Sequence, residues 1–218
     1  MPRAALFDMD NTLIRINSAR LFTKYRRDRG EIGFDHTLRV SWWLLRYWLG
    51  NLDAEVVAKK ALGDYRGTKE LDMIAMCDEW FNGYVKQHIT QAARAAVRAH
   101  RARGDTLVIA SSATPYVAGP LARELEIDHL VCSDLVVVDG VLTGDVLNPI
   151  CYGQGKLKKV QEFLGHRELT LQSATFYSDS ITDLPLLDAV GTAVVVNPDA
   201  RLWLKARDRG WRIERWTK

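Results

Sequence analysis

Cysteine is scarce in this chain of 218 residues, and no two cysteines stand close together. The three thiols, Cys77, Cys132 and Cys151, are odd in number and form no Cys-x-x-Cys pair. A disulfide framework and a structural zinc site both require a different spacing. We therefore expect reduced thiols and a cytoplasmic protein.

Long apolar runs and an excess of one charge are missing as well. The most hydrophobic segment, residues 40–50, contains Arg46 and is much shorter than the roughly 20 residues of a membrane-spanning helix. Asp8 interrupts the first apolar run, so we expect no secretory signal. With 30 basic and 27 acidic residues the net charge is only +3, and we expect no nucleic-acid partner.

What the sequence does contain is a strand pattern near its start and, after about residue 90, an alternation of strand and helix patterns. Apolar runs typical of strands lie at residues 4–7, 106–110, 173–180, 191–196 and 211–216. Helical patterns lie at residues 92–104, 115–127, 155–165, 181–191 and 199–210. A hairpin is expected around Asp139-Gly140. Strands that alternate with helices predict an α/β fold with a parallel, Rossmann-like sheet.

A stretch with helical patterns only follows the first strand. Its segments are residues 18–30, 36–48, 53–65 and 69–87, and Ser18 is the expected cap of the first helix. We expect residues 16–88 to form an inserted α-helical cap domain on a core made of residues 1–15 and 89–218. In such sheets ligands bind beyond the carboxyl ends of the strands, so polar residues that follow a strand are site candidates.

The first such segment is DMDNT, residues 8–12, directly after the apolar run 4–7. Residues two apart in extended chain point to the same side, so Asp8 and Asp10 converge on one spot. Two solvated turn acids, with Thr12 as a helix cap, are the alternative. The buried strand that precedes Asp8 favours a site.

Two further segments carry groups that suit an anion. The second strand ends at Ser111 and Ser112, whose hydroxyl and backbone N–H groups can hold phosphate oxygens, although a helix cap is the alternative. Lys156, which follows Gly155 before a helical run, can neutralise an anion. For any single lysine, plain exposure to solvent is the more common situation.

The last segment is SDSITD, residues 178–183, in which a strand runs into Asp179 and Asp183 follows. Acids favoured by the dipole at a helix start are the alternative interpretation. Taken together, however, three strands end in polar residues on one sheet edge. Carboxylates crowded in this way repel one another, and one is driven to protonate unless a cation is present. Mg²⁺ suits such a site, because it prefers carboxylates, waters and a substrate phosphate. The combination predicts a phosphate ester as substrate.

The order of these segments resembles the haloacid dehalogenase superfamily of phosphatases. DMDNT, an apolar run with SS, GK and SDSITD follow one another as in that family, over almost the whole chain. The helical insert after the first motif is similar to that of the subfamily that contains phosphoserine phosphatase. The resemblance implies a Rossmann-like core with a helical cap over the site.

The resemblance also implies roles in catalysis. Asp8 is the nucleophile that forms an aspartyl-phosphate, and Asp10 protonates the leaving group and then activates water. The candidates for holding the phosphoryl oxygens are Ser111, Lys156, Ser112 and Asn11.

A magnesium site follows from the same resemblance. Mg²⁺ is bound by the carboxylates of Asp8 and Asp179 and by the backbone carbonyl of Asp10. Asp183 supports the waters of the metal or Lys156.

The segment after the first motif bears on the leaving group. Phosphoserine phosphatases tend to carry an acid there, but this chain has none between Asp10 and Asp28. Arg15, Arg20 and Lys24 lie there instead. We therefore expect an anionic or polyol phosphate rather than phosphoserine. A solvated helix face is the simpler interpretation of the basic residues.

The Trp-rich segment 40–50 allows two interpretations. Its aromatic residues on more than one helix side favour packing within the cap, and a membrane or partner surface is the alternative. For the whole chain we expect a Mg²⁺-dependent phosphomonoesterase that acts on a small phosphorylated metabolite. Phosphotransfer to an alcohol, and a non-catalytic binding module on the same scaffold, are the alternatives.

Overall fold

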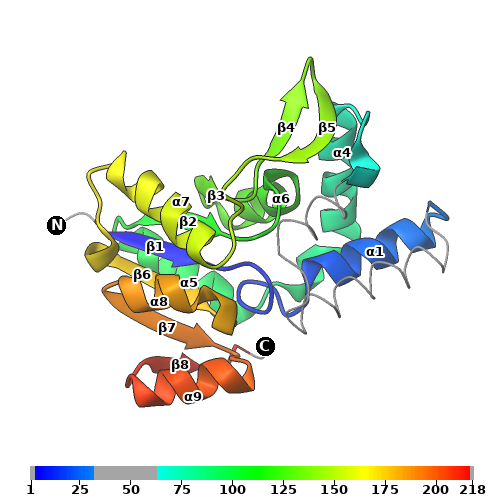
Figure 1. Cartoon of the computed structure of the whole chain (residues 1–218). Coiled ribbons are helices and arrows are strands. Elements are labelled where there is room, and N and C mark those ends of the chain that lie inside the picture. The colour runs from blue at the N-terminus through cyan, green and yellow to red at the C-terminus, as the bar shows by residue number, and fades with distance from the viewer. Residues whose placement is uncertain (1–2, 32–62, 217–218) are drawn as a thin grey trace.

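A parallel sheet forms the centre of the protein (Figure 1). The computed structural model describes residues 3–31 and 63–216. The strands of the sheet, in spatial order, are β3 (His129–Val131), β2 (Thr106–Ala110), β1 (Ala4–Phe7), β6 (Ala174–Ser178), β7 (Thr192–Val196) and β8 (Arg212–Glu214). All neighbouring pairs are parallel. The predicted α/β class with a parallel sheet is therefore confirmed, including the edge strand near the C-terminal end.

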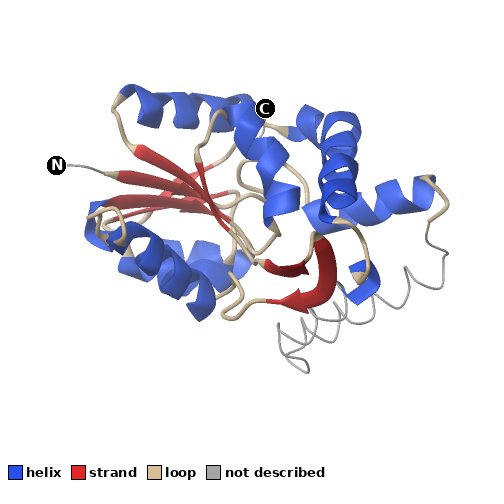
Figure 2. Ribbon diagram, turned by 90° about the horizontal axis from the view of Figure 1, so that it is seen from above, coloured by secondary structure: helices blue, strands red, loops and turns tan. Residues whose placement is uncertain are grey.

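Helices cover both faces of the sheet, as the view from above shows (Figure 2). They are α5 (Gln91–Ala102), α6 (Pro115–Leu125), α7 (Gln154–Gly165), α8 (Leu184–Ala189) and α9 (Ala200–Asp208). Successive residues of β1 point to opposite faces. Ala5 and Phe7 accordingly belong to the core under α5 and α6, whereas Ala4 and Leu6 belong to the core under α7, α8 and α9. The central strand is thus buried on both sides, and its position is fixed.

Two helices and a hairpin extend from the carboxyl ends of the strands (Figure 1). Helix α1 (Ser18–Asp28) packs through Phe22 against Trp80 of α4 (Glu70–Trp80), with ring centroids 5.3 Å apart. The predicted hairpin forms from β4 (Leu135–Val138) and β5 (Val141–Val146). Its apolar side packs on α4, because Leu135, Leu142 and Met73 share one buried cluster. The two helices and the hairpin therefore lie on the side of the sheet edge at which the motifs lie.

Some expectations differ from the structure or lie outside its description. Strand β3 has no predicted counterpart, because three residues are too short to show a pattern. The first cap helix has Asn17, not Ser18, as its N-terminal cap. The Trp-rich segment 40–50, the helix expected at 36–48 and most of that at 53–65 lie outside the described residues. The domain boundaries stay a prediction.

The expectation of free thiols is confirmed, because all three cysteines are buried and none of them forms a disulfide. In the described ranges, no helix combines the length and the apolar character needed to cross a membrane.

Candidate active site

The first and last motifs lie side by side at one edge of the sheet. The backbone N–H of Asp8 donates to the carbonyl of Tyr177 at 2.9 Å, so the chain after β1 continues its pairing with β6. Asp179 directly follows β6. On the other side, the N–H of Ser111 donates to Val131 at 3.0 Å. The ends of three neighbouring strands therefore bring these motifs to the same edge.

Lys156 joins the site from the first turn of α7. Its Nζ lies 2.9 Å from Asp8 Oδ1 and 2.8 Å from Asp183 Oδ2. The side chains of Lys156 and Asp183 are only 4% and 3% exposed. Ser178 Oγ donates to Asp183 at 2.7 Å and fixes that carboxylate. Gly155 lets the helix start here, because a Cβ at that position would collide with the carbonyl of Ile150.

The electrostatics of this cluster leave it short of positive charge. Burial raises the pKa of Asp8 to about 7 even though Lys156 opposes the shift, and the charges of Asp183 and Asp10 add to it. Burial and the charge of Asp8 raise the pKa of Asp179 to about 8. Burial alone would lower the pKa of Lys156, but Asp183 and Asp8 outweigh it and raise the pKa. One lysine does not neutralise these acids.

That shortage and the chemistry of the donors fit a magnesium ion. Carboxylate oxygens are the ligands that Mg²⁺ prefers, and it keeps waters in its other positions. In the described part of the chain, no group of three or more His, Cys, Asp or Glu side chains is placed to hold a metal ion. The expected ligands are the two carboxylates of Asp8 and Asp179 with the backbone carbonyl of Asp10. This set stays a prediction.

Asp10 is held by the start of helix α1. Its carboxylate accepts from the Ser18 N–H and the Ser18 Oγ, both at 3.0 Å, and from Asn17 Nδ2 at 3.2 Å. Burial raises the pKa of Asp10 to about 6, and the bonds from Ser18 restrain the rise. A carboxyl in this range can exchange a proton near neutral pH. The sequence pattern indicated Ser18 as a helix cap only and gave Asn17 no role, so their bonds to Asp10 were missed.

Two asparagines with positive φ support the first motif from the other side. Asn11 (φ 52) donates from Nδ2 to Asp179 Oδ2 at 3.2 Å. Its carbonyl accepts from Nδ2 of Asn197 (φ 46) at 3.1 Å. Asn197 Oδ1 in turn accepts from the N–H of Trp216 at 2.9 Å. Asn197 was not predicted as part of the site, although its place directly after β7 is a signal for this edge.

The two serines of the second motif differ in their surroundings. Ser111 is buried, and its Oγ accepts from the Ala113 N–H at 3.3 Å. Ser112 is exposed. Helix α6 has Thr114 as its N-cap residue, so neither serine has the capping role that was the alternative. Asn11, the other candidate for binding phosphate, donates its side-chain N–H to Asp179. Phosphate binding by Ser111, Ser112, Lys156 and Asn11 stays a prediction.

A cavity of about 600 Å³ opens next to these carboxylates. Its lining residues in the described ranges are Asn11, Ile16, Asn17, Arg20, Leu21 and Lys24. Two of them, Asn11 and Asn17, are hydrogen-bonded to Asp179 and Asp10, so the cavity lies beside the sheet edge that carries these carboxylates, which is called the catalytic edge below. Most of the other lining residues come from one face of α1.

Comparisons with known proteins point to one family. A family model described as haloacid dehalogenase-like hydrolase matches residues 5–188. The chain is 34% identical over 217 residues to a phosphoserine phosphatase of Mycobacterium tuberculosis, covering 96% of this chain and 70% of that protein. It is 31% identical to a histidinol-phosphatase of Neisseria meningitidis, covering 98% of each chain. A crystal structure of a protein of unknown function from Bordetella pertussis superimposes with a TM-score of 0.92 at 30% identity, covering 98% of each chain.

Proposed function

This chain belongs to the haloacid dehalogenase-like hydrolases, and we propose that it is a Mg²⁺-dependent phosphomonoesterase that works through an aspartyl-phosphate on Asp8. Its enzyme class is that of the phosphatases in this family. The substrates are phosphorylated small metabolites. The observation that carries the proposal is the buried contact of Lys156 with Asp8 and Asp183, next to Asp10 and Asp179.

In the first step a carboxylate oxygen of Asp8 attacks the phosphorus atom of the ester. A phosphorus–oxygen bond to Asp8 forms, and the bond to the leaving alcohol breaks. The ammonium of Lys156, 2.9 Å from Asp8 Oδ1, offsets negative charge on the transferring group. Mg²⁺ bound by Asp8, Asp179 and the Asp10 carbonyl would supply further electrostatic stabilisation of the same oxygens.

Asp10 handles the proton in both steps. As an acid it gives its proton to the leaving oxygen, so that an alcohol rather than an alkoxide departs. As a carboxylate it then takes a proton from water, whose oxygen attacks the phosphorus of the aspartyl-phosphate. Inorganic phosphate leaves, and Asp8 and Asp10 return to their starting states. The pKa of Asp10, about 6, suits both directions near neutral pH.

The test is phosphate release from a panel of phosphate monoesters, with Mg²⁺ and with a chelator. We expect release with Mg²⁺ only, and a loss of roughly 10⁴-fold or more in Asp8→Asn. Asp188→Asn is the matched control, because Asp188 pairs with Arg209 on the surface and is expected to leave the rate unchanged. Acid-quenched wild type should carry one phosphoryl group on Asp8 by mass spectrometry. Release that persists in chelator or in Asp8→Asn contradicts the proposal.

The same experiment separates the two alternatives. If an added alcohol receives the phosphoryl group in competition with water, the enzyme is a phosphotransferase with the same Asp8 intermediate. If the protein binds phosphate esters but neither releases nor transfers phosphate, it is a binding module. The intact set of Asp8, Asp10, Lys156, Asp179 and Asp183 favours turnover, because a binding module has no use for a buried nucleophile that is short of positive charge.

A further inference from the structure

The cavity beside the catalytic edge has a basic wall that the mechanism above does not use. Arg20 and Lys24 stand four residues apart on α1, so their side chains project from the same helix face, and both line the cavity. They belong to one helix with Ser18, which holds Asp10. From Ser18 to Arg20 the helix advances by about 3 Å along its axis, and to Lys24 by about 9 Å.

Among the residues that the structure describes, Arg20 is the cation of this wall whose side chain has no partner. Within the described part of the chain its guanidinium has no ion pair, and only its backbone N–H is engaged, by Asn17 Oδ1 at 3.1 Å. Lys24 differs, because its Nζ lies 2.5 Å from Asp28 Oδ2 and 5.3 Å from the centre of the Tyr84 ring. The charge of Lys24 is therefore already balanced.

The position of Arg20 does not serve the helix itself. It lies in the first turn of α1, which contains no acidic residue, whereas Arg26 and Arg27 lie in the last turn. The helix dipole disfavours a cation in the first turn and favours one in the last. A basic residue at the start of α1 thus opposes helix stability, and it is explained better by a ligand in the cavity.

The described lining of the cavity contains no acid. An ammonium group on the substrate would meet Asn17, Arg20 and Lys24 there and would have no carboxylate of this wall as a partner. An arginine fork matches the oxygens of a carboxylate or a phosphate. We infer that the leaving group of the natural substrate carries a second anionic group, a carboxylate or a phosphate, and no ammonium, and that Arg20 binds this anion. The inference rests on the proposed phosphomonoesterase function.

The substrate class follows from the geometry. The second anion has to lie within the cavity that Arg20 shares with Asn17, and Asn17 bonds to Asp10, so only a short linker fits between that anion and the ester oxygen. Small phosphorylated hydroxy acids and short bisphosphates have this form. Phosphoserine has a carboxylate but also an ammonium group, and a histidinol-type phosphate has an amine and no second anion.

The experiment compares substrates that differ in one group. The probes are 3-phosphoglycerate, phosphoserine and glycerol 3-phosphate, which share a carbon skeleton, together with 1,3-propanediol monophosphate and bisphosphate. We expect kcat/KM to be about tenfold to 100-fold higher for a probe with a second anion and no ammonium. The first set tests a carboxylate, and the diol pair tests a phosphate.

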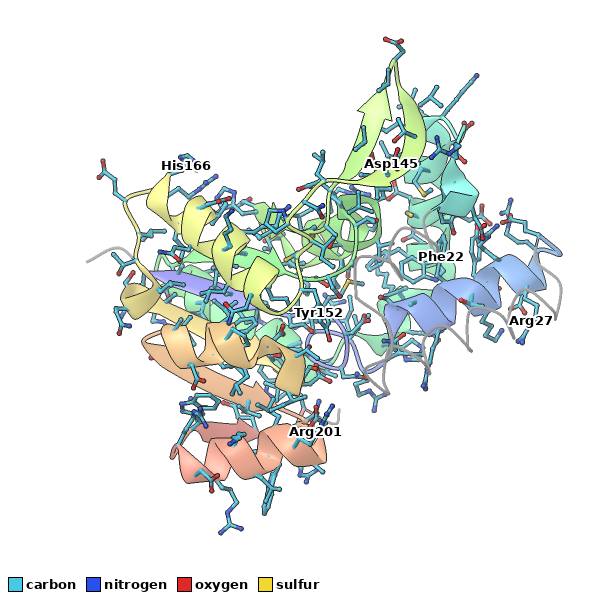
Figure 3. The ribbon with its side chains drawn as sticks, in the orientation of Figure 1. Phe22, Arg27, Asp145, Tyr152, His166 and Arg201 are labelled. Atoms are coloured by element: carbon cyan, nitrogen blue, oxygen red, sulfur yellow. The ribbon has the colours of Figure 1, made fainter. Side chains whose placement is uncertain are left out.

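Variants then assign the preference to Arg20. Arg20→Gln should remove the tenfold to 100-fold preference, mainly through KM, because kcat/KM falls much more for the probes with a second anion than for glycerol 3-phosphate. Arg20→Lys should restore part of the preference. Lys24→Gln should change the preference less. The charge-matched control is Arg27→Gln, at the far end of α1 (Figure 3), which should change nothing. The melting temperature of Arg20→Gln should be equal to or above that of the wild type.

The outcomes separate this inference from the function on which it rests. No turnover of any probe overturns the proposed function. Turnover with equal kcat/KM for all probes, with phosphoserine as the best probe, or with a preference that survives in Arg20→Gln, overturns the inference and leaves the function standing.

Discussion

Two buried carboxylates on the same sheet have pKa values shifted in opposite directions. Asp105 precedes β2, at the amino ends of the strands, and Asp8 follows β1, at the carboxyl ends. Burial acts to raise the pKa of Asp105, but hydrogen bonds from His100, Arg103 and Arg3 hold it below its ordinary value. Asp8 shares one lysine with Asp183, and its pKa is about 7.

The difference supports the cluster around Asp8 as the proposed site of catalysis. Around Asp105 the groups satisfy one another: His100 Nδ1 lies 2.7 Å from Asp105, and His100 Nε2 lies 2.9 Å from the Tyr177 hydroxyl. Tyr177 also stacks on Phe7, with centroids 4.9 Å apart. This cluster is complete and stabilises the fold. The cluster around Asp8 has acids with raised pKa values, which is typical of a site that awaits a ligand.

The largest effect on activity should come from the same chemical change made at both ends of the sheet. Asp10→Asn should lower kcat/KM for alkyl phosphates by about 10²- to 10⁴-fold, because the leaving oxygen loses its proton donor. The loss should be much smaller for p-nitrophenyl phosphate, whose leaving group departs without a proton.

The matched change Asp105→Asn should leave both rates unchanged and lower the free energy of unfolding, by about 1–3 kcal/mol in a urea titration. Equal losses of activity in the two variants would break the comparison between the clusters.

Removing a cation from each cluster should give the next largest effect. Lys156→Met should reduce kcat by about 10²- to 10³-fold, because the transferring group loses a buried charge that stabilises it. Arg103→Met should retain the wild-type kcat, because Arg103 contacts Asp105 at the opposite end of the sheet. Initial rates at saturating Mg²⁺ measure both. A Lys156→Met enzyme that is folded by circular dichroism and fully active would contradict the role assigned to Lys156.

These predictions start from features that the sequence already indicated. A buried parallel strand has a continuous apolar run, and its carboxyl end is visible as the first acid or serine, so Asp8, Ser111 and Asp179 were placed at the sheet edge. Lys156 was recognised only as one member of an ordered set. Its contact with Asp183 was one of two options, and the structure places its Nζ 2.8 Å from that carboxylate.

Other features had no such signal. Ser18 looks like a helix cap in the sequence, and its bonds to Asp10 depend on the path of the loop between β1 and α1. The pair His100 and Tyr177 is 77 residues apart and has no spacing rule that would join it. Asn197 meets Asn11 only because β7 lies beside β6. Contacts set by tertiary packing do not have a local pattern.

A smaller effect should come from Ser18, which tunes Asp10 without reacting. Its hydrogen bonds lower the pKa of Asp10, so Ser18→Ala should raise that pKa above about 6. The protonated acid then persists to higher pH. The alkaline limb of kcat/KM for an alkyl phosphate should move upward by up to about one pH unit. With p-nitrophenyl phosphate the limb should stay in place, and a downward move with either substrate would show that Ser18 does not act in this way.

A change at His100 is expected to have no effect on activity. Here the two clusters differ in the sign of their contribution to the pH dependence of stability. Burial lowers the pKa of His100 below its ordinary value of 6.5. Below pH 6.5 the folded state therefore binds fewer protons at His100 than the unfolded chain does. The contribution of neutral His100 to the free energy of unfolding is present in full above pH 6.5 and is lost as the pH falls. Asp8 and Asp179 act oppositely. Their raised pKa values of about 7 and about 8 cost stability as the pH rises from 3.8 towards those values.

Chemical denaturation of His100→Gln at a series of pH values tests that sign. Relative to the wild type, the variant should lose a positive slope of at most about 1.4 kcal/mol per pH unit just below pH 6.5, because one proton no longer couples to unfolding. His166→Gln, at the exposed end of α7 (Figure 3), should keep the slope. Because only the difference between variants is used, the opposing contribution of the catalytic acids cancels. An unchanged slope in His100→Gln would mean that folding does not shift the pKa of His100, and it would contradict the lowered pKa on which this comparison rests.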